Sequence, residues 1–133
     1  MLIQRARSYI YTTASPPSLA CALMKSLELI EIEPWRRQRL KALTRKLDRD
    51  LRLRRWQLSR SQTPIRPLII GGNREALAAS ETLGREGILV PAIRPPTVPA
   101  GTARLRISLS AAHAEADVDR LVGALRRAEQ ALP

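Results

Sequence analysis

The chain has 133 residues, which is enough for one domain with a modest hydrophobic core. Apolar residues make up 44% of the chain and aromatic residues only 3%, which excludes an intrinsically disordered protein and predicts an aliphatic core. A single cysteine rules out an intrachain disulfide, and charges interrupt every apolar run, so we predict no membrane span and no signal peptide. These features together favour a cytoplasmic protein without a membrane partner.

The first residues predict the end of one element followed by a short strand. Ile10 lies between Tyr9 and Tyr11, and aromatic and β-branched side chains favour strands. A single strand needs a sheet to join, and the few residues before it cannot supply one. We therefore expect this segment to join a larger structure.

A helix is predicted after Pro16. Pro17 suits a first helical turn, and Pro34 would stop the helix. Apolar residues recur between them at helical spacing, at Leu19, Leu23, Leu27 and Ile30. Cys21 has apolar neighbours, so we expect a small buried side chain there.

A strongly basic segment follows, from Pro34 to Arg60. It holds eleven Lys or Arg and two acidic residues, which accounts for nine of the net charge of +11. Its leucines fall on one helical stripe, so we predict an amphipathic helix with a solvated basic face, the stripe being Leu40, Leu43, Leu47, Leu51 and Leu58. A small nucleic-acid-binding module using the helix 34–60 remains an alternative. No aromatic interleaving supports it, so a nucleic-acid partner is not favoured.

The pattern then changes to strands alternating with helices. The run 65–70 predicts a strand that ends at Gly71-Gly72, and Asn73 is a candidate N-cap for the helix that follows. Leu77, Leu83 and the alanines between them would form the apolar side of that helix, with Gly87 as its C-cap. Another strand is predicted from Ile88 through Val90 toward Ile93.

The last third predicts one strand and one helix. From Ala103 to Ser110 apolar and polar residues alternate, with Leu105, Ile107 and Leu109 on one face. A helix is expected from about Ala114 to Leu132, with an apolar stripe of Val118, Leu121, Val122 and Leu125. The predicted fold class is α/β, with helices packed on a short and mostly antiparallel sheet.

One string in this region resembles a known family. Residues 93–106 read Ile-Arg-Pro-Pro-Thr-Val-Pro-Ala-Gly-Thr-Ala-Arg-Leu-Arg, and the string continues through 108–113. It is similar to the C-terminal signature of the 8-amino-7-oxononanoate synthases, which are α-oxoamine synthases among the fold-type I pyridoxal-phosphate enzymes. The run 9–17 and Ile69-Ile70-Gly71 resemble further family segments. The likeness is weakest over the basic helix.

The resemblance implies a reaction and a domain organisation. L-Alanine condenses with pimeloyl-CoA or pimeloyl-acyl carrier protein to give 8-amino-7-oxononanoate for biotin biosynthesis, in a homodimer that uses pyridoxal 5'-phosphate. Residues 1–33 would then be a strand and a helix that join the large domain. Residues 34–133 would form the C-terminal small domain of a fold-type I enzyme.

The same resemblance assigns four residues. Arg106 matches the family arginine that binds the carboxylate of the substrate amino acid, and a guanidinium offers two parallel donors for that task. Thr97 matches a substrate-contacting position. Thr12 and Thr13 match positions that reach the cofactor phosphate of the partner subunit. His113 is interpreted as structural, and no metal site is expected.

The family's catalytic residues have no counterpart here. The lysine that forms the aldimine with the cofactor belongs before Thr12, and Lys25, Lys41 and Lys46 all follow it. We therefore expect no catalytic residue in this chain and no synthase activity from the chain alone. A non-catalytic fragment, or a partner subunit that completes another chain, is a further alternative.

Overall fold

The computed structural model describes residues 2–132 and divides into two compact units, residues 1–34 and residues 35–133. The first unit contains two helices, α1 (Leu2–Arg5) and α2 (Pro17–Ile32). The second contains every strand and the remaining helices, which are α3 (Trp35–Asp50), β1 (Gln57–Leu58), β2 (Ile65–Gly71), α4 (Asn73–Arg85), β3 (Ala92–Ile93), β4 (Ala103–Ser108) and α5 (Glu115–Ala131). No helix of the described residues is both long and apolar enough to cross a membrane.

The strand predicted around Ile10 is wrong, because this segment forms turns. The N–H groups of Tyr9 and Ile10 donate to the carbonyl oxygen of Ala6, at 2.8 and 2.9 Å, and Thr12 N–H donates to Tyr9 at 3.0 Å. No strand lies in the described part of this unit with which it could pair. A β-prone tripeptide without a partner strand therefore satisfies its backbone locally.

Helix α2 has the predicted start and the predicted apolar spacing, but none of its residues is buried. The expected stripe stays exposed, at 49% for Leu19, 58% for Leu23, 63% for Leu27 and 58% for Ile30. Cys21 is also exposed, so the expectation that it would be buried is wrong. A periodic pattern predicts which side of a helix is apolar, whereas burial also requires an element that covers that side.

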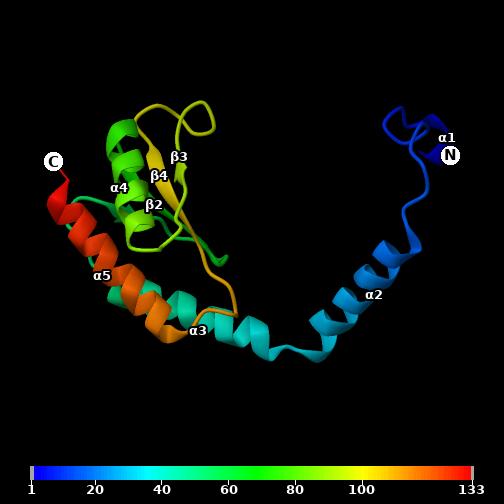
Figure 1. The fold of residues 1–133 in the computed structure, drawn as a ribbon, viewed down its shortest axis with the longest axis horizontal. Helices are drawn as coiled ribbons and strands as arrows, with labels where there is room; N and C mark the ends of the chain where they lie inside the picture. Colours follow the sequence, from blue (N-terminus) through cyan, green and yellow to red (C-terminus); the bar gives the residue numbers. More distant parts are fainter. Residues whose placement is uncertain (1, 133) are drawn as a thin grey trace. The chain divides into compact units, whose positions relative to one another are not determined.

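The sheet of the second unit is antiparallel throughout, in the order β1-β2-β4-β3. Helix α4 contacts β2, β3 and β4, and α5 packs on α3 and α4. Figure 1 shows α4 and α5 on one side of the sheet. The predicted α/β architecture, with helices on a short antiparallel sheet, is therefore confirmed.

The core lies between this sheet and its helices. Alternation places Leu105 and Ile107 inward, at 0% and 2% exposure, whereas Arg106 and Ser108 are exposed. The predicted stripe of α5 is buried in full, and Leu43 and Leu47 of α3 belong to the same cluster. Burying these aliphatic side chains supplies most of the stabilisation of the domain.

The basic segment is a shorter helix than predicted. Helix α3 ends at Asp50, and Leu58 lies in β1, paired with Leu68, rather than on the helical stripe. Three hydrogen bonds explain the break: the backbone N–H groups of residues 54–56 all donate to the carboxylate of Glu129. Glu129 lies on α5, so the contact that ends the helical pattern is remote in sequence.

The N-cap and the C-cap of α4 each lie one residue before the predicted cap. Gly72 rather than Asn73 is the N-cap, and Leu77 is 37% exposed because Ala76, Ala79 and Leu83 form the buried side. Glu86 is the C-cap, and Gly87 follows it with φ +75°. The Ile88–Val90 segment lies outside the strands, so the strand predicted there is limited to β3.

Candidate functional site

The strand β4 carries Arg106 on the sheet face opposite to α4. Its register pairs Arg106 with Pro67, Arg104 with Ile69 and Ser108 with Ile65, and directly opposed residues of an antiparallel pair point to the same face. Ile93 of β3 pairs with Arg104 and joins this outer face. The neighbours of Arg106 on the face are therefore mainly apolar, and no carboxylate lies among them.

The two arginines of β4 have different roles. The Nε and Nη2 atoms of Arg104 donate to the carbonyl oxygen and Oγ1 of Thr102, at 2.9 and 3.0 Å, and these bonds hold the start of the strand. The Arg106 side chain forms no hydrogen bond or ion pair with the described residues, while its backbone N–H donates to Pro91 at 2.9 Å. The Arg106 guanidinium thus sits on an ordered strand with its donors available for a carboxylate.

Thr97 lies in the loop that joins β3 to β4. Its side chain is exposed, and its N–H donates to the carbonyl oxygen of Arg94 at 3.0 Å, closing a turn around the cis Pro95-Pro96 bond. No hydrogen bond links Thr97 to Arg106. Thr97 and Arg106 thus lie in the same unit, one on the loop after β3 and the other on β4. A substrate site that they share requires at least this.

Thr12 and Thr13 belong to the first unit, in the segment before α2. The Oγ1 of Thr12 donates to the carbonyl oxygen of Tyr9 at 2.7 Å, and the exposed Thr13 side chain has no partner within residues 2–132. Helix α2 begins only at Pro17, so neither threonine lies in its first turn. Of the two hydroxyls, that of Thr13 is the one free to donate to a phosphate.

None of the three lysines is placed as a cofactor-attachment residue would be. Lys25 pairs with Glu28 at 2.8 Å on the exposed surface of α2. Lys46 pairs with Asp50 at 3.0 Å and with Asp119 at 2.6 Å, and these hydrogen bonds raise the pKa of its ammonium group. Lys41 is exposed on α3. Nucleophilic lysines need a lowered pKa, so Lys46 in particular is unsuited to the task.

Two polar clusters were missed by the sequence reasoning. Glu129 is 7% exposed and accepts N–H bonds from Arg54, Arg55 and Trp56; burial opposes the ionised form, but these bonds hold its pKa below the ordinary value. Arg66 is 5% exposed and donates to both carboxylate oxygens of Asp48. No sequence spacing predicts either cluster, because Glu129 is at least 73 residues from the N–H groups that it binds and Arg66 is 18 residues from Asp48.

His113 forms part of a turn, with its Nδ1 accepting the Ser110 N–H at 3.0 Å and its carbonyl oxygen accepting a bond from Arg39. The Asp117 carboxylate accepts the Ala114 N–H at 2.8 Å at the start of α5. Within the described residues no group of three or more His, Cys, Asp or Glu side chains could hold a metal ion.

Comparison with known proteins gives one family and two kinds of relative. The family model described as aminotransferase class I and II matches residues 1–125. An 8-amino-7-oxononanoate synthase of Azoarcus sp. (strain BH72) is 58% identical over 130 residues, covering 98% of this chain and 33% of the relative. The synthase of Aromatoleum aromaticum is 59% identical over 128 residues, covering 96% and 33%.

Solved structures agree with these relatives. A serine palmitoyltransferase of Sphingomonas wittichii matches with a TM-score of 0.88 and 29% identity, over 99% of this chain and 34% of that one. An 8-amino-7-oxononanoate synthase of Francisella tularensis matches with a TM-score of 0.76 and 29% identity, over 95% and 37%. The chain therefore spans about a third of the length of the relatives and structures that it matches.

Proposed function

Since the chain belongs to the family of class I and II aminotransferases, we propose that it is the C-terminal part of an 8-amino-7-oxononanoate synthase. That enzyme condenses L-alanine with a pimeloyl thioester, and carbon dioxide and the thiol leave. Support comes from 58% identity to a synthase over 98% of the chain. The relatives are three times as long, so the activity belongs to a larger protein than these 133 residues.

The observation that carries the proposal is the environment of Arg106. A guanidinium on a rigid strand, with apolar neighbours and no internal carboxylate partner, binds a ligand carboxylate in a fixed orientation. Holding the alanine carboxylate fixes how the bonds at the α-carbon are directed. Thr97, on the preceding loop, would contact the same substrate.

Pyridoxal phosphate, when bound, supplies the electron sink for negative charge at the amino-acid α-carbon. Several solved serine palmitoyltransferase structures that the chain matches are described as containing PLP. In this chain the free Thr13 hydroxyl would hold the cofactor phosphate of a partner subunit in a homodimer, and the Thr12 hydroxyl would join it on giving up its bond to Tyr9. Residues 1–33 would join the large domain, and residues 34–133 would be the small domain.

An exchange experiment tests this function. The matching third of the Azoarcus synthase is replaced by this chain, and formation of 8-amino-7-oxononanoate from alanine and pimeloyl-CoA or pimeloyl-acyl carrier protein is measured. We expect an active chimera in which Arg106→Ala lowers kcat/KM for alanine by about a hundredfold or more. Arg94→Ala is the matched control, because Arg94 is an exposed arginine on the neighbouring loop.

Two results would contradict the proposal. A chimera that folds and binds pyridoxal phosphate but makes no product would show that this chain cannot serve in the reaction. Equal losses in the Arg106 and Arg94 variants would remove the carboxylate role of Arg106. The isolated chain, treated with pyridoxal phosphate and borohydride, should show no stoichiometric adduct on any lysine.

A further inference from the structure

A groove of about 370 Å³ runs between α3 and the segment 61–64 that leads into β2. It lies within the second unit and on elements that hold none of the residues assigned to the synthase reaction. Leu40 and Pro64 contribute apolar wall, and Thr63 stands on the loop side. The groove is thus separate from the residues proposed to bind alanine and the cofactor phosphate.

One wall of the groove is a row of cations. Arg37, Lys41 and Arg45 all line it, and their spacing of four residues places them on one side of α3 over a length of about 12 Å. Lys41 and Arg45 are exposed and have no hydrogen bond or ion pair with the described residues. Lys41 and Arg45 therefore present two neighbouring positive charges that a ligand with more than one anionic group could contact.

The only acidic residue that lines the groove is already neutralised. Asp48 accepts hydrogen bonds from the Nε and Nη2 atoms of Arg66, the first at 3.0 Å, and Arg66 is 5% exposed. A bidentate pair of this kind cancels the charge of the carboxylate inside the groove. The repulsion that Asp48 would exert on an anionic ligand is therefore small.

The same arginine fixes the opposite wall. Arg66 Nη1 donates to the carbonyl oxygen of Ser61, which ties the loop to α3 through Asp48. Within the loop, the hydroxyls of Ser61 and Thr63 are joined at 2.9 Å, and the Thr63 N–H donates to the Ser61 hydroxyl at 3.1 Å. Both walls are thus held before any ligand arrives, which lowers the entropic cost of binding.

The Gly71-Gly72 turn before α4 is a strand-to-helix joint, a geometry that can bind phosphate, but it is less suitable than the groove. Glu75 lies in the first turn of α4, with its Oε2 3.8 Å from where a Cβ of Gly72 would stand. Its Oε1 accepts the Trp56 indole N–H at 2.9 Å and pairs with Arg55 at 3.3 Å. Arg55 contacts only one oxygen of Glu75, whereas Arg66 donates to both oxygens of Asp48, so Glu75 retains more of the negative charge that repels an anion.

We propose that the groove between α3 and segment 61–64 binds a nucleotide-like phosphate ester, a ligand with an apolar ring system and more than one phosphate. The ring would lie against Leu40 and Pro64, and the phosphates would follow the cations. Guanidinium and ammonium groups are the usual partners of phosphate in proteins. The groove holds none of the residues assigned to alanine or to the cofactor phosphate, so the proposal does not depend on those assignments.

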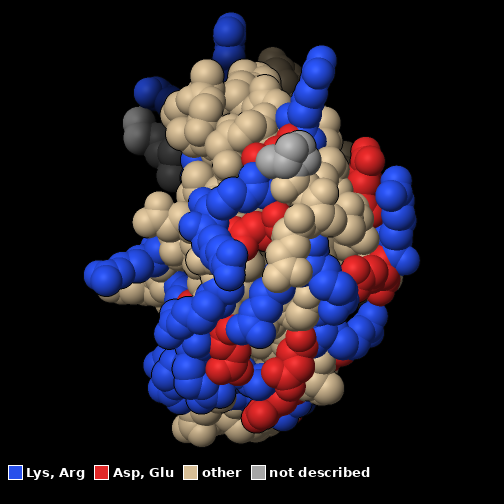
Figure 2. All heavy atoms as spheres, turned by 90° about the vertical axis from the view of Figure 1, so that its left-hand side faces the viewer, with Lys and Arg blue, Asp and Glu red and all other residues tan. Residues whose placement is uncertain are grey.

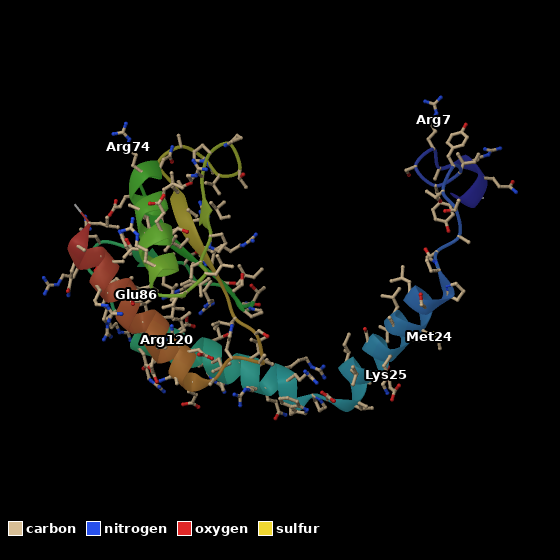
Figure 3. The ribbon with its side chains drawn as sticks, viewed as in Figure 1. Arg7, Met24, Lys25, Arg74, Glu86 and Arg120 are labelled. Carbon is tan, nitrogen blue, oxygen red and sulfur yellow. The ribbon has the colours of Figure 1, made fainter. Side chains whose placement is uncertain are left out.

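Calorimetric titration of the 133-residue chain with adenosine 3',5'-bisphosphate at low salt tests this site. We expect measurable binding, weakened about tenfold or more in the double variant Lys41→Ala, Arg45→Ala. The matched control is Arg74→Ala, Arg85→Ala, which removes two exposed cations of α4 that have no partner among the described residues. Figure 3 shows Arg74 pointing away from the domain, and this control should change the affinity by less than about twofold.

A second pair of variants adds charge and removes no cation. Thr44 lines the groove, is half-buried and donates to the carbonyl oxygen four residues earlier at 2.8 Å. Thr82 on α4 has the same burial and the same bond, at 2.8 Å. Thr44→Glu should weaken binding by about tenfold and Thr82→Glu by less than about twofold, because only the first carboxylate faces the phosphates.

Titration with further ligands tests the role of the phosphates in binding. Adenosine without phosphate should not bind, and inorganic phosphate should bind more weakly than the bisphosphate. Equal losses in the two double variants, or no binding of the bisphosphate, would overturn the proposal. Tighter binding of a single-stranded oligonucleotide that depends on Arg49 and Arg52 as much as on the groove would replace it with a nucleic-acid surface.

Discussion

The helices α2 and α5 have almost the same length and both carry apolar residues at helical spacing, yet they differ completely in burial. Helix α2 has 16 residues and buries none of them, whereas α5 has 17 and buries seven. In α5 Leu125 is fully enclosed, at 0% exposure, while Leu23 of α2 is 58% exposed. The difference lies in the surroundings, because α3 and α4 both pack on α5.

The polar residues of the two helices repeat this contrast. Glu28 of α2 pairs with Lys25 on the surface, where both side chains are more than half exposed. Glu129 of α5 is buried and binds three backbone N–H groups of the segment 54–56. Exposed ion pairs contribute little to stability, whereas a buried carboxylate that caps backbone donors contributes more.

The basic surface also belongs to this comparison. Figure 2 shows Lys and Arg over much of the face that α5 presents, with Asp and Glu between them. Arg120 and Arg127 both reach Glu86 beyond the end of α4, at its carbonyl and carboxylate oxygens, and Figure 3 shows Arg120 and Glu86 close together. Two arginines of α5 thus bind the residue that follows α4 and stabilise the packing of the two helices.

Replacing one leucine in each helix by alanine should give the largest difference in the free energy of unfolding. Leu125→Ala should lower the free energy of unfolding by about 2–5 kcal/mol, because it leaves a cavity in the core. Leu23→Ala should change it by less than about 0.5 kcal/mol, because the side chain is already exposed. Urea unfolding of the 133-residue chain, followed by circular dichroism, measures both values.

A large loss for Leu23→Ala would break the comparison. It would mean that the apolar side of α2 is covered in solution, by a second copy of the chain or by another surface. Two measurements on the wild-type chain serve as the control. Sedimentation would detect self-association through α2, and such association would also make the unfolding midpoint depend on protein concentration.

Replacing one glutamate in each helix by glutamine should give an intermediate difference in the free energy of unfolding. Glu129→Gln should cost about 1–3 kcal/mol, because the amide offers only one acceptor oxygen and no charge to the N–H groups of residues 54–56. Glu28→Gln, the matched control on α2, should change the free energy of unfolding by less than about 0.5 kcal/mol. Thermal unfolding at neutral pH compares them.

The effect of Glu129 should also depend on pH. Its pKa in the folded protein lies below the ordinary value of 4.5, so the unfolded chain takes up the proton first. The contribution is fully present above that ordinary value and is lost as the pH falls through the folded pKa. The stability gap between wild type and Glu129→Gln should therefore narrow as the pH falls below about 4.5; a constant gap would show that the charge contributes nothing.

The sequence predicted those elements whose local pattern and surroundings agree. Alternation in β4 placed Leu105 and Ile107 inward and Arg106 outward, and the stripe of α5 was predicted in full. These patterns suffice because the strand and the helix each have one covered side. The resemblance of residues 93–106 to the synthases is confirmed by the relatives, and this string contains Arg106.

The elements that were missed depend on contacts between remote residues. Nothing near Leu58 signals that the helical stripe has ended, because the cause is Glu129 on another helix. Arg104 and Arg106 have the same place in the alternation, and only the bonds of Arg104 to Thr102 separate a structural arginine from an available one. Likewise, the spacing of Lys41 and Arg45 shows a row of cations but not the loop that faces it.

The way the helices end gives the smallest expected effect. Helix α2 stops before Pro34, which needs no special conformation, whereas α4 leaves through Gly87 at φ +75°, with Ile88 N–H donating to Leu83 at 2.9 Å. Gly87→Ala should cost about 1 kcal/mol, because a Cβ is strained at that φ. Gly84→Ala, inside the same helix with nothing within 4 Å of the added methyl group, should instead stabilise by about 0.5–1 kcal/mol. Opposite signs in thermal unfolding would show that the exit of α4 depends on backbone conformation, and equal signs would mean that the turn at Gly87 is not held in solution.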